Sequence, residues 1–369
     1  MIKEILADLV RIDSVSSRSN AEIVEYLERR CEALGLITRR LPYSDELGIE
    51  KVNLIALTSD VTEVELGLVG HTDTVPYDPN WSEATNLTER DGKLFGRGSC
   101  DTKGFIAAAL TALENFKPNK PLALVFTADE EIGLRGAKQL AQLKPLRVRY
   151  SIVGEPTSLK PIRAGKGYSL AEVIVKGREA HSAYPALGAS AVFRAAHLIN
   201  RLESIATKLK DDQHPAFDPP YTTLNIGLIH GGSAKNVLAG ECRFTLEWRP
   251  IPTQPSDHLL NLFNAAIEEE TKADPGFQCE VDASRQDTGF ETSPDSPLIK
   301  LLERASGKES GTVAFGTEAA QMMLLGSEAV VIGPGDIREA HRTGEFVPVD
   351  ELERCADILR QSIQQLCSS

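Results

Sequence analysis

The sequence predicts an α/β fold in which one mostly parallel sheet is flanked by helices and interrupted by a smaller α+β domain. Strand-like apolar runs alternate with helical patterns up to about residue 164 and again from about residue 288, which is typical of a parallel sheet covered by helices. Between them the order of elements is β-α-β-β-α-β, as in ferredoxin-like domains. The 369 residues also suffice for about two domains at ~150 residues each. We therefore expect a discontinuous main domain at 1–164 and 288–369 and an inserted domain at 165–287.

The first part of the main domain begins with two helices. Apolar residues recur at helical spacing from Ile2 to Leu9, and Asn20 can cap a second helix. The segment at 78–98 is rich in glycine and contains Pro79, so it is expected to be a loop. The remaining expected elements are strands near 36–42, 52–58, 65–70, 122–127 and 151–153 and helices at 3–12, 20–34, 103–113 and 134–142.

The inserted domain and the second part of the main domain follow the same reasoning from apolar periodicity. In the inserted domain we expect strands at 168–176, 222–230, 240–248 and 277–283 and helices at 188–206 and 257–271. After it we expect helices at 297–305, from about 318 and from 349, with strands at 312–314 and 329–332.

Composition narrows the class of protein. Hydrophobic content of 41% and charged content of 25% are ordinary for a soluble globular chain. The formal net charge of -13 argues against a general binder of nucleic acid or of anionic membranes. No run of ~18 apolar residues could span a bilayer, and the first residues lack a signal-peptide pattern. The six cysteines are scattered without a Cys-x-x-Cys pair, which favours reduced thiols and a cytoplasmic location.

Five loops that follow predicted strands carry residues of the types that bind metals or transfer protons: His71 and Asp73, Asp101, Glu130 and Glu131, Glu155, and His341. Each loop alone has an ordinary structural explanation, such as a helix N-cap or a solvated acidic turn. In an open α/β sheet, however, the loops at the carboxyl ends of strands converge on one crevice. Two histidines and several carboxylates suit zinc or cobalt, and a carboxylate two residues after a histidine can orient its ring.

The motifs that carry these residues resemble the metal-dependent family of acetylornithine deacetylases, succinyl-diaminopimelate desuccinylases, aminoacylases and related carboxypeptidases. They occur in the family's order across almost the whole chain: GHTDTVP at 70–76, GRGSCDTKG at 96–104, DEEIG at 129–133, GEPT at 154–157, AHSAYP at 180–185, GGSAKNV at 231–237 and AHRTGEF at 340–346. The resemblance implies a zinc-peptidase-like catalytic domain at 1–164 and 288–369, with the insert at 165–287 acting as a lid and dimerisation domain.

The resemblance also implies a site for one or two zinc ions, with cobalt as the alternative metal. Its ligands would be Asp101 bridging two ions, His71 and Glu155 on one ion, and Glu131 and His341 on the other. The peptide after the bridging residue, Asp101–Thr102, would be cis. Cys100 would pack in the interior and would not bind metal.

Further residues receive roles from the same resemblance. Asp73 would orient His71, and Glu130 would be the general base that takes a proton from a metal-activated water and later returns one to the departing amine. His181 would help to stabilise the oxyanion, unless it is an ordinary surface histidine. Asn236 and Arg249 would hold the substrate, because an arginine suits bidentate capture of a carboxylate; Arg249 could equally be a surface residue at a strand end.

Within the family, the segments at 154–167 and 219–232 look closest to acetylornithine deacetylases. Two departures fall near the expected side-chain pocket: Gly165-Lys166-Gly167 replaces a His-Lys-Gly element, and the sequence at 246–249 differs from the usual acidic-then-Arg form. The predicted reaction is therefore hydrolysis of N-acetylornithine or N-acetylcitrulline, in arginine biosynthesis, to acetate and the free amino acid. The alternatives are a succinyl-diaminopimelate desuccinylase, a general aminoacylase or dipeptidase, and a metal-bound scaffold protein without activity. A homodimer through the inserted domain is also expected.

Overall fold

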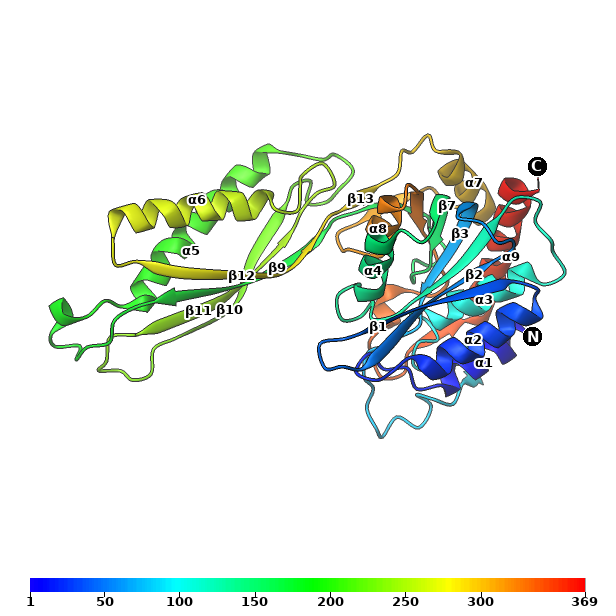
Figure 1. Cartoon of the computed structure of the whole chain (residues 1–369), viewed down its shortest axis with the longest axis horizontal. Coiled ribbons are helices and arrows are strands. Elements are labelled where there is room, and N and C mark those ends of the chain that lie inside the picture. The colour runs from blue at the N-terminus through cyan, green and yellow to red at the C-terminus, as the bar shows by residue number, and fades with distance from the viewer. Residues whose placement is uncertain (369) are drawn as a thin grey trace. The chain divides into compact units, whose positions relative to one another are not determined.

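The computed structural model describes residues 1–368, and these form two compact units (Figure 1). Unit 1 consists of Met1–Arg163, Glu291–Gly311 and the chain from Thr317 onward. Unit 2 consists of Ala164–Phe290 and Thr312–Gly316. The chain thus leaves unit 1 for most of unit 2, returns, crosses once more into unit 2 at Thr312–Gly316, and then finishes unit 1.

Unit 1 is built on a mixed sheet whose central strands are parallel. The strand order is β1-β2-β6-β3-β7-β15-β8-β13, with β14 paired to β8. Strands β6, β3, β7 and β15 are parallel, whereas β1 and β2 add an antiparallel edge. The bounds are β1 (Ile37–Ser44), β2 (Glu50–Leu57), β3 (Glu63–His71), β6 (Leu122–Thr127), β7 (Arg147–Val153), β8 (Ile162–Gly165), β13 (Phe290–Glu291), β14 (Gly311–Val313) and β15 (Glu328–Val331). The predicted α/β class is confirmed.

Helices cover both faces of this sheet (Figure 1). All eleven residues of α3 are buried, because it lies between the sheet and the helices α1 and α9. On the other face, α4 packs against α8, which in turn contacts β15. The bounds are α1 (Ile2–Arg11), α2 (Ala21–Ala33), α3 (Lys103–Leu113), α4 (Arg135–Leu143), α7 (Pro297–Ser306), α8 (Ala319–Leu324), α9 (Val349–Cys367) and the short 3-10 helix η3 (Ile337–Glu339).

The segment at 78–98 is not entirely a loop, and this part of the sequence prediction is wrong. Strands β4 (Thr88–Arg90) and β5 (Lys93–Phe95) form a hairpin that continues into β16 (Phe346–Pro348). The turn between them is Asp91-Gly92, and both residues have positive φ, 51° and 70°. Asp-Gly is a favoured pair for such a two-residue turn, but three-residue strands are too short to show alternation in the sequence.

Unit 2 has the predicted β-α-β-β-α-β order. Its antiparallel sheet has the order β10-β11-β9-β12, and helices α5 and α6 pack on each other and on this sheet through a separate apolar core. The bounds are β9 (Tyr168–Lys176), η1 (Pro185–Leu187), α5 (Ala191–Lys208), η2 (Leu209–Asp211), β10 (Thr223–Gly231), β11 (Glu241–Arg249), α6 (His258–Ala273) and β12 (Gln278–Asp287). Among residues 1–368, no helix has the length and apolar character needed to cross a bilayer.

Candidate metal centre

The parallel strands of unit 1 bring their carboxyl ends to one edge of the sheet. His71, the last residue of β3, pairs with Thr127 at the end of β6, and Val69 of β3 pairs with Val153 at the end of β7. Gly154 follows β7 directly, and a Cβ atom there would lie 2.2 Å from Cγ of Phe105 in α3. Only glycine therefore allows this strand end to approach the helix so closely.

Asp101 lies between two histidines and offers one carboxylate oxygen to each. Its Oδ1 is 3.0 Å from Nε2 of His71, and its Oδ2 is 3.0 Å from Nε2 of His341. Nε2 of His341 is also 3.0 Å from Oε2 of Glu131. Ligand atoms of His71, Asp101 and Glu131 all lie within 4.8 Å of one another. These groups could together hold a divalent metal ion.

The imidazole of His71 lies closer to the backbone carbonyl of Asp73 than to its carboxylate. The imidazole Nδ1 lies 3.0 Å from the carbonyl oxygen of Asp73, but 3.7 Å from its Oδ1. Donation from Nδ1–H to the carbonyl fixes the ring so that its Nε2 faces Asp101. That the Asp73 side chain orients His71 stays a prediction, and the carbonyl of the same residue is the nearer acceptor.

The carboxylate of Asp73 holds the loop after β6. Its Oδ1 accepts the backbone N–H of Glu130 at 3.0 Å, and its Oδ2 accepts that of Glu131 at 3.3 Å. Oδ2 also accepts the hydroxyl of Ser16 at 2.7 Å. A charged acceptor thus fixes the backbone of two adjacent glutamates, and sequence reasoning did not find this contact.

A second network, also missed from the sequence, anchors the residue before these glutamates. Asp129 has a positive φ of 55°, and its Oδ1 accepts a bond from Nζ of Lys51 at 2.8 Å while Oδ2 accepts the hydroxyl of Tyr43 at 3.0 Å. Lys51 is buried and also donates to the carbonyls of Ser16 and Arg18. The one available signal was a lysine that directly precedes the apolar run of β2.

Burial and like charges shift the titration of the acidic groups. Burial is the largest cause that raises the pKa of Glu130 and Glu155 well above the usual value, and the charge of Asp101 adds to it. Burial raises the pKa of Glu131 in the same way. Burial also raises the pKa of Glu318 to about 7 against the opposing effect of His71; Glu318 was not among the predicted site residues.

The pKa values of the two histidines are also raised, whereas that of Asp101 is lowered. Hydrogen bonds with Asp101 and Glu131 raise the pKa of His341 to about 10. Burial would raise the pKa of Asp101, but hydrogen bonds from His341 and His71 outweigh it and hold this pKa below its usual value. Burial would lower the pKa of His71, yet Asp101 keeps it well above normal. Clustered carboxylates need compensating positive charge, and a divalent ion bound by oxygen and imidazole ligands supplies it. The residues therefore fit a divalent metal.

Two other residues that were predicted near this centre, Glu155 and Cys100, lie in the interior of unit 1. Glu155 is buried directly after β7, and the Asp101–Thr102 peptide is cis, as the resemblance implied. Cys100 is buried, and burial raises the pKa of its thiol well above normal, which disfavours the thiolate.

His181, Asn236 and Arg249 all belong to unit 2. A β-bridge joins His181 to Val237, and the N–H of Ser182 donates to the carbonyl of Asn236 at 3.0 Å, so the structure brings these two segments together. Arg249 lies at the far end of β11, where it pairs with Glu247 at 2.9 Å, and is therefore not brought to them.

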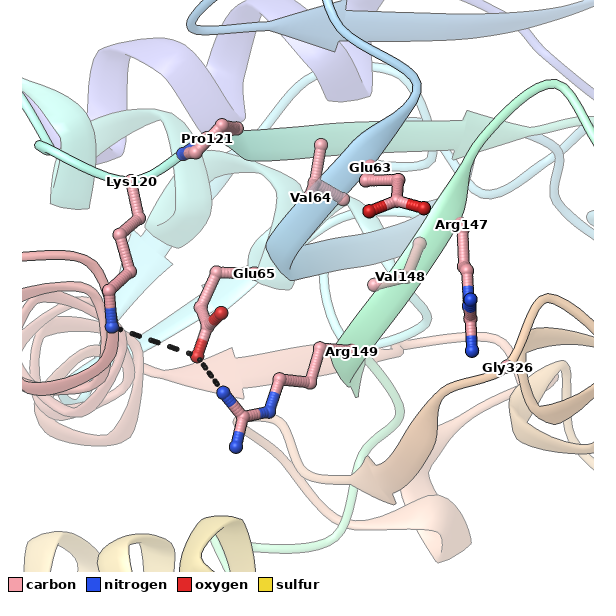
Figure 2. A pocket seen from close by; sticks show the side chains of 9 residues that line it. All are labelled: Glu63, Val64, Glu65, Lys120, Pro121, Arg147, Val148, Arg149 and Gly326. Carbon is pink, nitrogen blue, oxygen red and sulfur yellow. Dashed lines mark hydrogen bonds and ion pairs between the residues drawn. The ribbon is translucent and has the colours of Figure 1, made fainter.

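A surface cavity of about 390 Å³ lies at the opposite ends of the strands. Figure 2 shows Glu65 of β3 between Arg149 of β7 and Lys120, at 3.0 and 4.0 Å. The walls of the cavity include the first residues of β3 and β7, whereas His71 is the last residue of β3. The charges around Glu65 compensate one another, so the cavity does not show the uncompensated acidity of the metal centre.

The chain matches a known protein family, curated relatives and solved structures. Residues 67–365 match the model of peptidase family M20/M25/M40. The chain is 50% identical to the acetylornithine deacetylase of Myxococcus xanthus over 99% of this chain and 97% of the relative. It is 34% identical to that of Klebsiella pneumoniae over 99% and 97%. Among solved structures, a tripeptidase from Staphylococcus aureus has a TM-score of 0.77 at 24% identity, covering 99% of this chain and 98% of that one. An M20 family metallo-carboxypeptidase from Sulfolobus solfataricus has a TM-score of 0.75 at 18% identity, covering 98% of each chain.

Proposed function

The chain belongs to peptidase family M20/M25/M40, and we propose that it is the metal-dependent enzyme that hydrolyses N-acetylornithine in arginine biosynthesis. Water would add its oxygen to the acetyl carbon, the C–N bond would break, and acetate and ornithine would leave. The observation that carries this proposal is Asp101, whose two oxygens face His71 and His341 beside the half-buried Glu130. The full-length identity of 50% to an acetylornithine deacetylase supports the substrate.

The residues that would hold two divalent ions are His71, Asp101, Glu131, Glu155 and His341. Zinc is our first choice and cobalt the second, because both accept imidazole and carboxylate ligands. When bound, such ions polarise an amide carbonyl and lower the pKa of water from ~15.7 toward ~7.

Glu130 is proposed as the general base. The N–H bond to Asp73 fixes its backbone, and burial together with the charges of Glu131 and Glu318 raises its pKa well above normal. A carboxylate with a raised pKa accepts a proton from water and can then return it to the leaving amine near neutral pH.

Residues of unit 2 are proposed to contact the substrate after closure of a lid. His181 would donate to the oxyanion, and Asn236 and Arg249 would bind the substrate's polar groups. Nδ1 of His181 accepts the N–H of Ala183 at 3.1 Å, which leaves Nε2 as the ring donor. The guanidinium carbon of Arg249 lies 4.5 Å from the centre of the Tyr168 ring, a contact that would hold the guanidinium while its N–H edge binds a carboxylate.

The neutral relative acetylcitrulline is the second candidate substrate, because the family's His-Lys-Gly element is changed here. A Cβ atom at Gly165 would lie 2.5 Å from Cε1 of Phe290, so the ring of Phe290 excludes a histidine at that position. Lys166 is buried and donates to the carbonyls of Pro219 and Tyr221, at 2.7 Å each. The ammonium of Lys166 therefore makes hydrogen bonds within unit 2, which stabilise its fold.

We also infer a cytoplasmic location, because all six cysteines are free.

We further infer a homodimer that forms through unit 2. Strand β10 is the edge of its sheet, and Leu228 and Ile229 on it are 59% and 52% exposed. Phe193 of the adjacent helix α5 is 72% exposed. An apolar sheet edge favours pairing with another strand, and a second copy of the chain supplies one.

The proposal is tested by comparing kcat/KM on acetylornithine, acetylcitrulline, succinyl-diaminopimelate and a panel of dipeptides. Acetylornithine should give the highest value, and a chelator should abolish the activity until zinc or cobalt is added. A higher kcat/KM on another member of the panel would replace the proposed substrate. Zinc binding without hydrolysis of any acylated amino acid would instead favour the scaffold alternative.

A further inference from the structure

Glu345 is a buried carboxylate that contacts the backbone beside Asp101. Its Oε1 accepts the N–H groups of Cys100 and Asp101, both at 3.0 Å, and its Oε2 accepts Nη1 of Arg97 at 2.6 Å. The side chains of Glu345 and Arg97 are 1% and 5% exposed. A carboxylate that accepts two successive N–H groups holds that backbone with charge-assisted bonds. Asp73 holds Glu130 and Glu131 in the same way.

Glu345 also joins two segments that carry different ligands. It lies four residues after His341, in the same loop, and its carbonyl accepts the N–H of Gly96 at 3.1 Å. Directly after it, Phe346 pairs with Phe95 in the small sheet formed by β16 and β5. The loop of His341 and the segment that leads to Asp101 are therefore tied together through this one residue.

The two sides of Asp101 differ in how firmly their ligands are held. His71 ends a central strand, is 1% exposed, and donates to the carbonyl of Asp73. His341 is 52% exposed and has a positive φ of 59° in a loop. Strand pairing fixes the first histidine, whereas the second depends on the contacts of its loop. Glu345 supplies one of the buried contacts.

We propose that Glu345 and its partner Arg97 are positioning residues that set the affinity of the metal ion on the His341 side of Asp101. This inference rests on the proposed metal centre. An ordinary buried ion pair would stabilise the fold without such an effect. Here the same carboxylate accepts the N–H of the bridging residue, so its loss displaces Asp101 relative to His341 while His71 stays in place.

The test compares two double variants of the full chain in zinc titrations of the metal-free protein by calorimetry. Arg97→Met/Glu345→Gln keeps an amide oxygen for the two N–H groups, whereas Arg97→Met/Glu345→Met removes the acceptor. The wild type should bind two ions. The Gln variant should stay close to it, and the Met variant should keep one tight ion and bind the second about 10- to 100-fold more weakly, as for loss of other outer-shell partners.

Glu303→Met is the matched control, because Glu303 also accepts a backbone N–H, that of Ser310 at 2.8 Å, without touching a site residue. It should leave both zinc affinities unchanged. Equal affinity of the second ion in the two double variants would overturn the proposal.

A measurement on the wild type covers the case in which the Met variant does not fold. Hydrogen exchange of the Cys100 and Asp101 amides should be slow in the metal-free protein, and fast exchange would contradict the Glu345 contacts.

The outcomes also separate this inference from the proposed function. A chain that binds two ions but does not hydrolyse acetylornithine refutes only the function, whereas a wild type that binds fewer than two ions refutes the inference.

Discussion

Asp73→Asn is the substitution that most sharply tests how the catalytic loop is held. Oδ1 accepts the N–H of Glu130, and Oδ2 accepts the N–H of Glu131 and the hydroxyl of Ser16. An asparagine has the same shape, but its NH₂ group must replace one of these oxygens. Because both oxygens accept a backbone N–H, the NH₂ group faces a donor in either orientation. The nearly isosteric change therefore loses at least one bond.

The expected magnitude follows from the charge of the acceptor. A hydrogen bond to a charged group contributes about 1.5–3 kcal/mol, and an N–H left without a partner adds a desolvation cost. We expect a loss of about 2–3 kcal/mol in positioning the two glutamates. If the whole of this loss raises the activation free energy, kcat falls about 30- to 150-fold, since about 1.36 kcal/mol corresponds to a factor of ten.

The assay is kcat and KM on acetylornithine, with bound zinc measured on the same samples. Zinc on the His71 side should be retained, because the carbonyl of Asp73, which contacts His71, is unchanged, whereas an ion held by Glu131 should bind more weakly. Asp45→Asn is the control: only one oxygen of Asp45 accepts two N–H groups, those of Leu47 and Ile49, so the amide oxygen can replace it. A wild-type kcat for Asp73→Asn would refute the reasoning. A fall in activity that only mirrors the loss of all bound zinc would show that the carboxylate also acts on His71.

Three further predictions test other parts of the structure. Glu130→Gln should lower kcat about 10²- to 10⁴-fold, the usual contribution of a general base, with zinc retained; unchanged turnover would remove Glu130 from that role. Lys51→Met leaves the carboxylate of Asp129 buried without its cation, and should lower the free energy of unfolding in urea by about 3–5 kcal/mol; adding Asp129→Asn should recover part of the loss, and no recovery would contradict the pairing. Burial and Asp8 raise the pKa of Tyr26 to about 12, so the folded state holds this proton more tightly and stability falls as the pH rises from about 10 to about 12. Tyr26→Phe should therefore weaken the pH dependence of unfolding in that window, and an unchanged slope would refute the shift.

The sequence was sufficient to predict the elements that depend on local patterns. Strand β9 and helix α3 have the predicted bounds, because apolar periodicity and glycine punctuation act within a few residues. The β4–β5 hairpin was missed because its strands have only three residues each. The types of the candidate ligands were also readable, since the motifs that carry them lie at or beyond the ends of predicted strands.

The contacts that hold these ligands could not be read in the same way, because they join distant parts of the chain. Asp73 bonds to Glu130 across 57 residues, and Lys51 bonds to Asp129 across 78. Glu345 reaches Asp101 across 244 residues. A carboxylate gives the same local signal whether it binds a metal, caps a helix or accepts backbone N–H groups from another loop, so only the folded structure assigns its role.

The placement of these contacts explains why charged residues that are not expected to bind metal recur inside the motifs. Asp73 belongs to the loop of His71 but holds the loop of Glu130 and Glu131, and Glu345 belongs to the loop of His341 but holds the loop of Asp101. Each anchoring carboxylate thus joins its own loop to a neighbouring one. Movement of any one loop would break a charge-assisted bond in another, so the ligands should be ordered before a metal arrives. Such preorganisation favours tight binding, because less conformational entropy is lost when the ions bind.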